Sequence, residues 1–219
     1  MRAPDGANAE SDRVANMKLY ASLASSFARK IRVMLLEKSV AHEVQMVNLW
    51  EPNDYKTTNP VGKVPALKLD DGRVLVSSSL IADYVDARYP DPRLIPADFE
   101  MRLEVRRWEA LADGTMEAVS ASLYEMRFHD EQKRSQAWLD RQRGKVDAGF
   151  AALEPMLGRN EWCVGGAMSL ADITVACHIG FIALRAPQFF PQEMYPALTQ
   201  LWKKMEERGS MKRTAPPPA

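Results

Sequence analysis

The sequence predicts a protein of two parts, an α/β unit followed by an all-α unit. Before about residue 90, short strand-like stretches alternate with stretches of helical spacing, which is typical of an α/β unit. Residues 90–96 form a proline-rich crossing through which no helix could continue. After residue 98, every periodic stretch has helical spacing. We therefore place the division between the two units at this crossing.

Composition limits the classes of function. The chain has 219 residues, of which 46% are hydrophobic, enough for a substantial core. Acidic and basic residues number 29 each, so no charge excess points to nucleic acid or to a membrane surface. No apolar run approaches the ~20 residues of a membrane-spanning helix. Residues 1–15 lack the apolar segment of a secretory signal, and we expect a flexible extension there.

The two cysteines indicate the compartment. Cys163 and Cys177 lie in apolar surroundings and have neither a CxxC nor a metal-binding spacing. Free buried thiols fit a reducing cytoplasm better than a disulfide framework. The three histidines are far apart in the sequence, so we expect core or surface roles for them and no metal site.

The first helix carries the most informative position. Residues 17–21 are expected to form a strand, and apolar residues then follow at i, i+4, i+7 and i+8: Phe27, Ile31, Met34 and Leu35. Ser25 stands at the turn, where an N-cap belongs. A hydroxyl at the positive end of a helix could stabilise an anion such as a thiolate. Alternatively, Ser25 only caps its own helix, and this stretch alone leaves both interpretations open.

The remaining elements of the first unit follow from alternation and turn signals. We expect strands at three further places: residues 42–47, the stretch around Leu67 and Leu69, and residues 74–76, with a turn at 70–73 between the last two. A short helix is possible within residues 50–59, and the serine run 77–79 should cap a longer one. The predicted order is β-α-β-α-β-β-α.

The second unit is predicted to contain four helices. Apolar residues at helical spacing mark them within four ranges: 103–126, 139–157, 173–184 and 198–205. The third is apolar nearly all round, so it should be the buried centre. Ser169 and Asp172 fit a capping box at its start, which is a folding signal.

These patterns predict a domain organisation. Its parts are a flexible extension at 1–15, an α/β domain at 16–90, a linker at 91–97, an all-helical domain at 98–212 and a loose tail at 213–219.

The order of the motifs resembles the cytosolic glutathione S-transferase family. The motifs are a serine at the first helix start, Asn59-Pro-Val-Gly-Lys-Val-Pro65 before the third strand, a serine-rich cap, and Gly165-Gly-Ala-Met-Ser-Leu-Ala-Asp172. The run Ser25-Ser-Phe-Ala-Arg-Lys30 resembles the Ser-Pro-Phe-x-Arg-Lys of bacterial serine-type members. The resemblance covers residues 17–215 and implies a thioredoxin-like domain with a mixed four-stranded sheet, followed by a helical bundle.

The resemblance also implies a site and a reaction. Ser25 would donate its hydroxyl to the sulfur of glutathione, the co-substrate. Val64, ahead of a cis Pro65, would pair its backbone with the cysteinyl part. The Val64-Pro65 dipeptide by itself does not decide between a cis and a trans peptide bond. It is a weak signal for cis, because only ~5% of X-Pro bonds are cis. Ser78 would hold the γ-glutamyl carboxylate, and Lys63 is a less secure contact for the glycyl carboxylate. The protein would be a cytoplasmic homodimer acting on a small electrophile in detoxification, without a metal.

Two positions depart from the family pattern. Members usually carry an acidic residue just before the serine of the third helix, where it holds the ammonium group of glutathione, and here the residue is Ser77. Because a neutral hydrogen bond is worth about half a charge-assisted one, glutathione should bind roughly tenfold more weakly. A carboxylate from a partner subunit is a possible compensation. Ser26 replaces the proline that often follows the catalytic serine.

Two rival functions remain beside glutathione transfer. The neutral Ser77 leaves open a non-catalytic binding or regulatory protein of the same fold. A thiol–disulfide oxidoreductase would want cysteine at position 25 or 26, and both are serine. Met116, Tyr124 and Phe128 either line a pocket for the electrophile or belong to the core, and Arg102, Arg106 and Arg107 form a solvated face or an interface.

Overall fold

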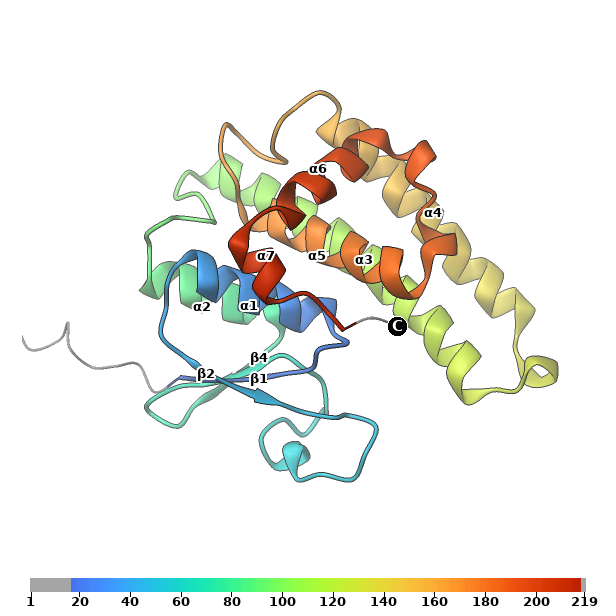
Figure 1. The fold of residues 1–219 in the computed structure, drawn as a ribbon, viewed down its shortest axis with the longest axis horizontal. Coiled ribbons are helices and arrows are strands. Elements are labelled where there is room, and N and C mark those ends of the chain that lie inside the picture. The colour runs from blue at the N-terminus through green and yellow to red at the C-terminus, as the bar shows by residue number, and fades with distance from the viewer. Residues whose placement is uncertain (1–16, 218–219) are drawn as a thin grey trace, which may run out of the picture.

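The computed structural model describes residues 17–217, so the expected extension at residues 1–15 lies outside the described residues. The chain forms an α/β layer and a larger helical layer, packed side by side (Figure 1). Within residues 17–217, no helix is long and apolar enough to cross a membrane. No group of His, Cys, Asp and Glu side chains in this part of the chain could hold a metal ion.

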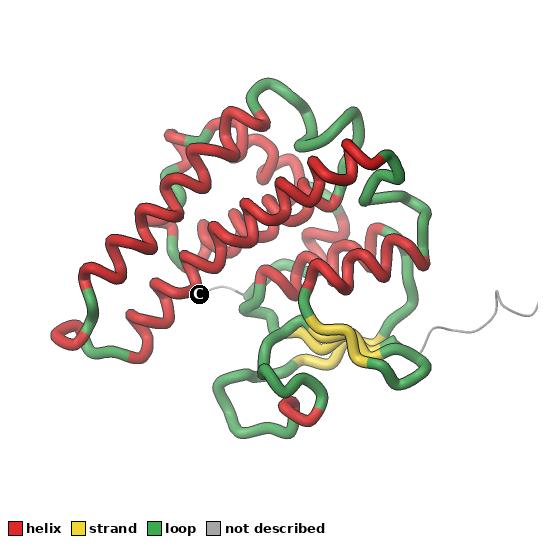
Figure 2. Tube along the Cα trace, turned by 180° about the vertical axis from the view of Figure 1, so that it is seen from behind, coloured by secondary structure: helices red, strands yellow, loops and turns green. Residues whose placement is uncertain are grey.

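Four strands form one mixed sheet in the order β2-β1-β3-β4. They are β1 (Lys18–Ala21), β2 (Glu43–Met46), β3 (Ala66–Lys68) and β4 (Val74–Val76). β1 and β2 run parallel, whereas β3 is antiparallel to both β1 and β4. Helices α1 (Ser26–Glu37) and α2 (Ser78–Arg88) cover one face of the sheet (Figure 2).

The predicted thioredoxin-like order β-α-β-α-β-β-α is confirmed. Its second helical element is the single 3₁₀ turn η1 (Tyr55–Thr57), within the connection where a short helix was expected. The apolar stripe predicted for the first helix is also found. Ile31, Met34 and Leu35 are fully buried against the sheet side, because residues spaced by three or four positions share one helix face.

The second layer contains five helices among the described residues: α3 (Phe99–Phe128), α4 (Gln136–Leu157), α5 (Leu170–Arg185), α6 (Pro196–Glu206) and α7 (Gly209–Arg213). The 3₁₀ turns η2 (Glu131–Lys133), η3 (Pro187–Phe189) and η4 (Gln192–Met194) connect them. As predicted, α5 is the buried centre. Its capping box is formed, and the Asp172 carboxylate also accepts the Cys163 N–H at 2.8 Å, which anchors the preceding loop.

The crossing between the two layers is held by buried polar groups. The Asp86 carboxylate at the end of α2 accepts the N–H groups of Leu94 (2.8 Å) and Ile95 (3.2 Å). The buried Lys38 ammonium pairs with Asp86 at 2.7 Å and donates to the carbonyl of Tyr89. The proline-rich segment is therefore tied to the first layer.

The C-terminal end differs from the expectation. Arg213 is the last residue of α7, and Thr214 is buried, so both residues are packed where a loose tail was expected. The Arg29 guanidinium accounts for this packing, because it donates to the Met211 carbonyl (3.0 Å) and binds Glu206 of α6. A five-residue helix with one buried apolar side chain, Met211, leaves no periodic signal in the sequence.

The two layers share one core. A continuous cluster of buried apolar side chains includes Leu19 and Ile31 of the first layer and Trp108, Val119 and Ile179 of the second. Both cysteines are free and buried. Burial raises the pKa of the Cys177 thiol to about 12 and raises that of Cys163 further, so neither is a reactive thiolate.

Candidate functional site

The residues proposed for the site gather at one end of the sheet. In the sheet register, Tyr20 of β1 lies opposite Ala66 of β3, and Ala66 lies opposite Val76 of β4. Pro65 therefore precedes β3, and Ser77 follows β4, at the same end where β1 finishes. Ser25 is reached from that end by one tight turn, in which its N–H donates to the Ser22 carbonyl at 3.1 Å.

Ser25 caps α1 and keeps a free donor. Its backbone is extended, and its hydroxyl oxygen accepts the N–H of Ala28 at 3.1 Å, as predicted for an N-cap. Its own O–H has no acceptor among the described residues. Because capping uses a lone pair and anion binding uses the proton, one half-buried hydroxyl can do both.

The segment before β3 presents an open backbone edge. The Val64-Pro65 bond is cis, and the Val64 N–H and C=O have no hydrogen-bond partner in the described part of the chain. The neighbouring Lys63 carbonyl is held by the Tyr55 hydroxyl and the Asn59 amide, each at 2.7 Å. The backbone of Val64, a half-buried residue, thus offers a short edge that an extended peptide could pair with.

Tyr55 and Asn59 are positioning residues to which sequence reasoning assigned no role. Tyr55 is buried, and its ring contacts Tyr20 with 5.5 Å between centroids. Burial raises the pKa of the Tyr55 phenol, so it stays a hydrogen-bond donor. The only sequence signal for this role was that Asn59 begins the Asn59–Pro65 motif before the third strand. The Lys63 side chain, by contrast, is exposed and forms no ion pair with another described residue.

The start of α2 is built from three consecutive serines. Ser77 is exposed and occupies the left-handed region at φ 77°, a strained position for a non-glycine residue. Its hydroxyl lies 2.9 Å from that of Ser79. Ser78 is the buried first residue of the helix, and the first turn carries no acidic side chain. The amides and dipole there remain available for an anion.

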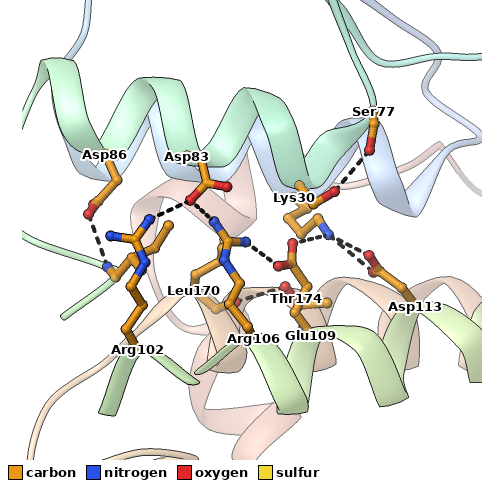
Figure 3. A network of polar contacts seen from close by, with 12 residues as sticks. Lys30, Ser77, Asp83, Asp86, Arg102, Arg106, Glu109, Asp113, Leu170 and Thr174 are labelled. Carbon is orange, nitrogen blue, oxygen red and sulfur yellow. Dashed lines mark hydrogen bonds and ion pairs between the residues drawn. The ribbon is translucent and has the colours of Figure 1, made fainter. Parts of the chain in front are cut away.

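A buried polar network lies behind Ser25 and joins both layers. The hydroxyl of Ser26 contacts His178 Nδ1 of α5 at 2.9 Å, and His178 Nε2 contacts Asp113 of α3 at 2.7 Å. The fully buried Lys30 ammonium lies between Asp113 (3.1 Å) and Glu109 (2.8 Å), as Figure 3 shows.

The network continues to α2. Arg106 donates to Glu109 on its own helix and to Asp83 of α2, and Arg102 binds the same Asp83 carboxylate at 3.1 Å (Figure 3). The helices that begin at Ser25 and at Ser78 are therefore fixed to the same stretch of α3.

Burial and charge set the protonation of this network. Burial lowers the pKa of His178, so its ring is neutral at pH 7. Burial acts to raise the pKa of Asp113, but the hydrogen bond from His178 and the charge of Lys30 outweigh it and lower that pKa. His178 Nε2–H therefore donates to Asp113, and Nδ1 accepts the proton of the Ser26 hydroxyl. Ser26 and His178 are 152 positions apart, so no spacing in the sequence could reveal the contact.

The three residues singled out for an electrophile pocket separate in the structure. Met116 is buried in the core, whereas Tyr124 and Phe128 are exposed near the end of α3. Both contact Trp50, which follows β2.

Comparison with known proteins decides the family. Residues 19–93 match the model of the glutathione S-transferase N-terminal domain, and residues 136–201 match that of the C-terminal domain. A glutathione S-transferase from Methylobacillus flagellatus, crystallised with glutathione, is 39% identical with a TM-score of 0.89, over 92% of this chain and all of that one. This chain belongs to the glutathione S-transferase family.

Other members of the glutathione S-transferase family widen the comparison. The GST-like protein YibF of Escherichia coli is 34% identical over 93% of this chain and its own full length. A Pseudomonas fluorescens family member with bound glutathione is 33% identical with a TM-score of 0.86, over 92% of this chain and all of that one. The maleylacetoacetate isomerase of Pseudomonas aeruginosa is 28% identical over 91% of this chain and 92% of that protein.

Proposed function

We propose that this family member binds glutathione at the sheet end and holds its sulfur as a thiolate that attacks a small electrophile. The observation that carries the proposal is the convergence of three groups: the free O–H of Ser25, the unpaired backbone of Val64 and the open start of α2 at Ser78. The glutathione bound in similar structures supports this choice of ligand. Ser25 as the stabilising residue corresponds to a serine-type transferase.

The chemistry follows from acidity. A free thiol titrates near ~8.5, so only a few per cent is thiolate at neutral pH. Lowering that pKa by ~2 units needs ~2.7 kcal/mol of extra stabilisation of the anion. A hydrogen bond from Ser25 and the dipole of α1 can supply it. The thiol proton leaves to water, the thiolate sulfur bonds to the electrophilic carbon, and a group such as halide departs with the electron pair.

Each remaining part of glutathione has a proposed contact. The cysteinyl backbone pairs with Val64 beside Pro65, and the γ-glutamyl carboxylate sits on the amide and hydroxyl of Ser78. The glycyl carboxylate is proposed to meet Lys63, whose side chain is exposed. The ammonium meets only neutral Ser77, which predicts weaker binding unless a carboxylate of a partner subunit reaches it. We propose a homodimer in the cytoplasm, where glutathione and reduced thiols coexist.

Calorimetry with glutathione, followed by turnover of an aryl halide and of an alkyl hydroperoxide, tests the proposal. We expect micromolar to millimolar binding together with turnover of at least one electrophile. Binding without any turnover would favour the non-catalytic binding protein. Absence of binding would contradict the proposal. Buried cysteines with raised pKa values give no support to a thiol–disulfide oxidoreductase.

A second reaction type is supported by the relatives. The Pseudomonas aeruginosa protein is named for isomerisation of maleylacetoacetate. The same thiolate could add to a carbon–carbon double bond, allow rotation and leave again, with glutathione regenerated. Isomerisation of maleylacetoacetate in the presence of glutathione, without consumption of glutathione, distinguishes this reaction from conjugation.

A further inference from the structure

Three aromatic side chains form an exposed cluster between the two layers. Trp50 follows β2, whereas Tyr124 and Phe128 lie in the last turns of α3. Ring centroids are 5.8 Å apart for Trp50–Tyr124, 5.7 Å for Trp50–Phe128 and 6.3 Å for Tyr124–Phe128. Their exposed fractions are 49%, 50% and 63%. Three large rings that contact one another and still face solvent mark a binding surface.

A cation is fixed at this aromatic cluster. The guanidinium of Arg127 lies 4.2 Å from the centroid of the Trp50 ring. The Arg127 side chain forms no ion pair or hydrogen bond with any other residue between 17 and 217. The ring therefore orients the guanidinium while its N–H groups stay free, and such a planar fork fits a carboxylate with two hydrogen bonds.

The cluster flanks the same sheet end as Ser25. Val47 donates its N–H to Ala21, the last residue of β1, at 2.8 Å, and Trp50 is only three residues further on. On α3, Asp113 is linked through His178 to Ser26. Tyr124 is eleven residues beyond Asp113, about 16 Å along the helix. Figure 1 shows the start of α1, the loop after β2 and the end of α3 on one side of the molecule, and Figure 2 shows the same from behind.

We propose that this cluster binds the electrophilic co-substrate, and that the co-substrate is a planar aromatic molecule carrying a carboxylate. The inference rests on the proposed function and names its substrate class. The rings of Tyr124 and Phe128 contact the aromatic plane of the co-substrate, and Arg127 holds its carboxylate. A neutral aliphatic electrophile gains neither contact.

The test compares two aryl halides of different charge, a chlorodinitrobenzoate and the corresponding chlorodinitrobenzamide, with each kcat/KM divided by the rate constant of the uncatalysed reaction with glutathione. With wild-type protein and glutathione, we expect kcat/KM to be at least tenfold higher for the benzoate. Arg127→Gln should remove this preference by lowering kcat/KM for the benzoate about tenfold, with less than a twofold change for the amide. Trp50→Ala should lower both. Equal selectivity in wild type and Arg127→Gln would overturn the proposal.

Two controls show whether the effect is specific to Arg127 and to the co-substrate. Arg107→Gln removes an exposed arginine paired with Glu104 earlier on α3 and should change neither substrate. Glutathione affinity, measured by calorimetry, should be the same in wild type and Arg127→Gln. If wild-type protein does not bind glutathione, the proposed function fails, and calorimetry with unreactive nitrobenzoate still tests the cluster by itself.

The alternative occupant of the cluster is a second copy of the chain. Sedimentation of wild type and Trp50→Ala at several concentrations detects it. A dimer that Trp50→Ala dissociates, combined with no benzoate preference in wild type, would assign the cluster to self-association and overturn the proposal.

Discussion

At the residue scale, the serines around the sheet end differ in whether the hydroxyl proton is still free to donate a hydrogen bond. Ser25 accepts one hydrogen bond and keeps its proton. The proton of Ser26 is directed to His178, and the hydroxyl of Ser77 lies against Ser79. Of the two adjacent serines at the start of α1, only Ser25 can therefore donate to a bound sulfur.

The neutral residue before Ser78 leads to the first prediction. Ser77→Glu should tighten glutathione binding about tenfold, because a carboxylate there pairs with the ammonium group more strongly than a hydroxyl does. Ser77→Ala is the control for loss of the hydroxyl and of its contact with Ser79. Calorimetry showing no gain for Ser77→Glu would mean that another group already holds the ammonium.

The buried lysine of α1 leads to the second prediction. Lys30→Met should lower the free energy of unfolding by about 3–5 kcal/mol, because it leaves Glu109 and Asp113 without their shared cation. The matched control Lys212→Met breaks an exposed pair with Glu207 and should leave the stability almost unchanged. Urea unfolding measures both, and equal losses would contradict the account of the network.

Single residues were predictable where local spacing carries the signal. The cap at Ser25 and the box at Ser169 and Asp172 follow from their distance to an apolar run, and both are found. By contrast, the hydrogen bond between His178 and Ser26 and the one from the Tyr55 hydroxyl to the Lys63 carbonyl depend only on how the folded chain brings these residues together. No pattern within a few residues encodes them.

At the element scale, one glycine of α4 lies in close contact with α3. A Cβ at Gly149 would lie 2.0 Å from the Thr115 hydroxyl oxygen, which donates to the Leu111 carbonyl at 2.7 Å. Gly144 lies on the same helix, and a Cβ there would meet nothing within 4 Å. The helix contact therefore requires the absence of a side chain at one glycine only.

The third prediction uses this pair of glycines. Gly149→Ala should destabilise the protein by about 1–3 kcal/mol, because Thr115 must give up its place or the helices must separate. Gly144→Ala should stabilise it by up to about 1 kcal/mol, since alanine favours a helix over glycine. Thermal unfolding of the two variants gives the signs, and a stabilising Gly149→Ala would contradict the packing.

The type of an element was predictable where the helix is long or where apolar and polar residues alternate regularly along the strand. The four strands and the four long helices of the second layer follow from period and turn signals. The connection within residues 50–59 became one 3₁₀ turn, and α7 was not foreseen, because such short elements are set by the groups that contact them. For α7, that group is Arg29.

At the scale of the whole molecule, one polar network and one apolar core join the two layers. Three carboxylates, of Asp83, Glu109 and Asp113, face three cations, of Lys30, Arg102 and Arg106. The balance holds only while His178 is neutral. Protonation of His178 would place a fourth positive charge among three carboxylates in a buried setting and would reverse its contact with Ser26.

The fourth prediction concerns pH. A histidine in the unfolded chain titrates at ~6.5. Burial makes the pKa of His178 lower than this value in the folded protein. Below that value the unfolded state binds more protons, so stability should fall with decreasing pH by up to about 1.4 kcal/mol per pH unit. Asp113, whose pKa is also lowered, adds a further loss only as pH drops below the usual range of a carboxyl group.

Urea unfolding across this pH range checks the prediction. His178→Asn should flatten the slope just below pH ~6.5, whatever its effect on stability at neutral pH. An unchanged slope in His178→Asn would show that other groups cause the loss.

The most direct test of the central claim is a pH titration of the thiolate absorbance of glutathione bound to wild type, Ser25→Ala and Ser25→Thr. We predict a thiol pKa about 2 units below the free value of ~8.5 in wild type and in Ser25→Thr, which retains the hydroxyl. In Ser25→Ala the pKa should return most of the way to the free value. The same low pKa in Ser25→Ala would contradict the claim that this hydroxyl stabilises the thiolate.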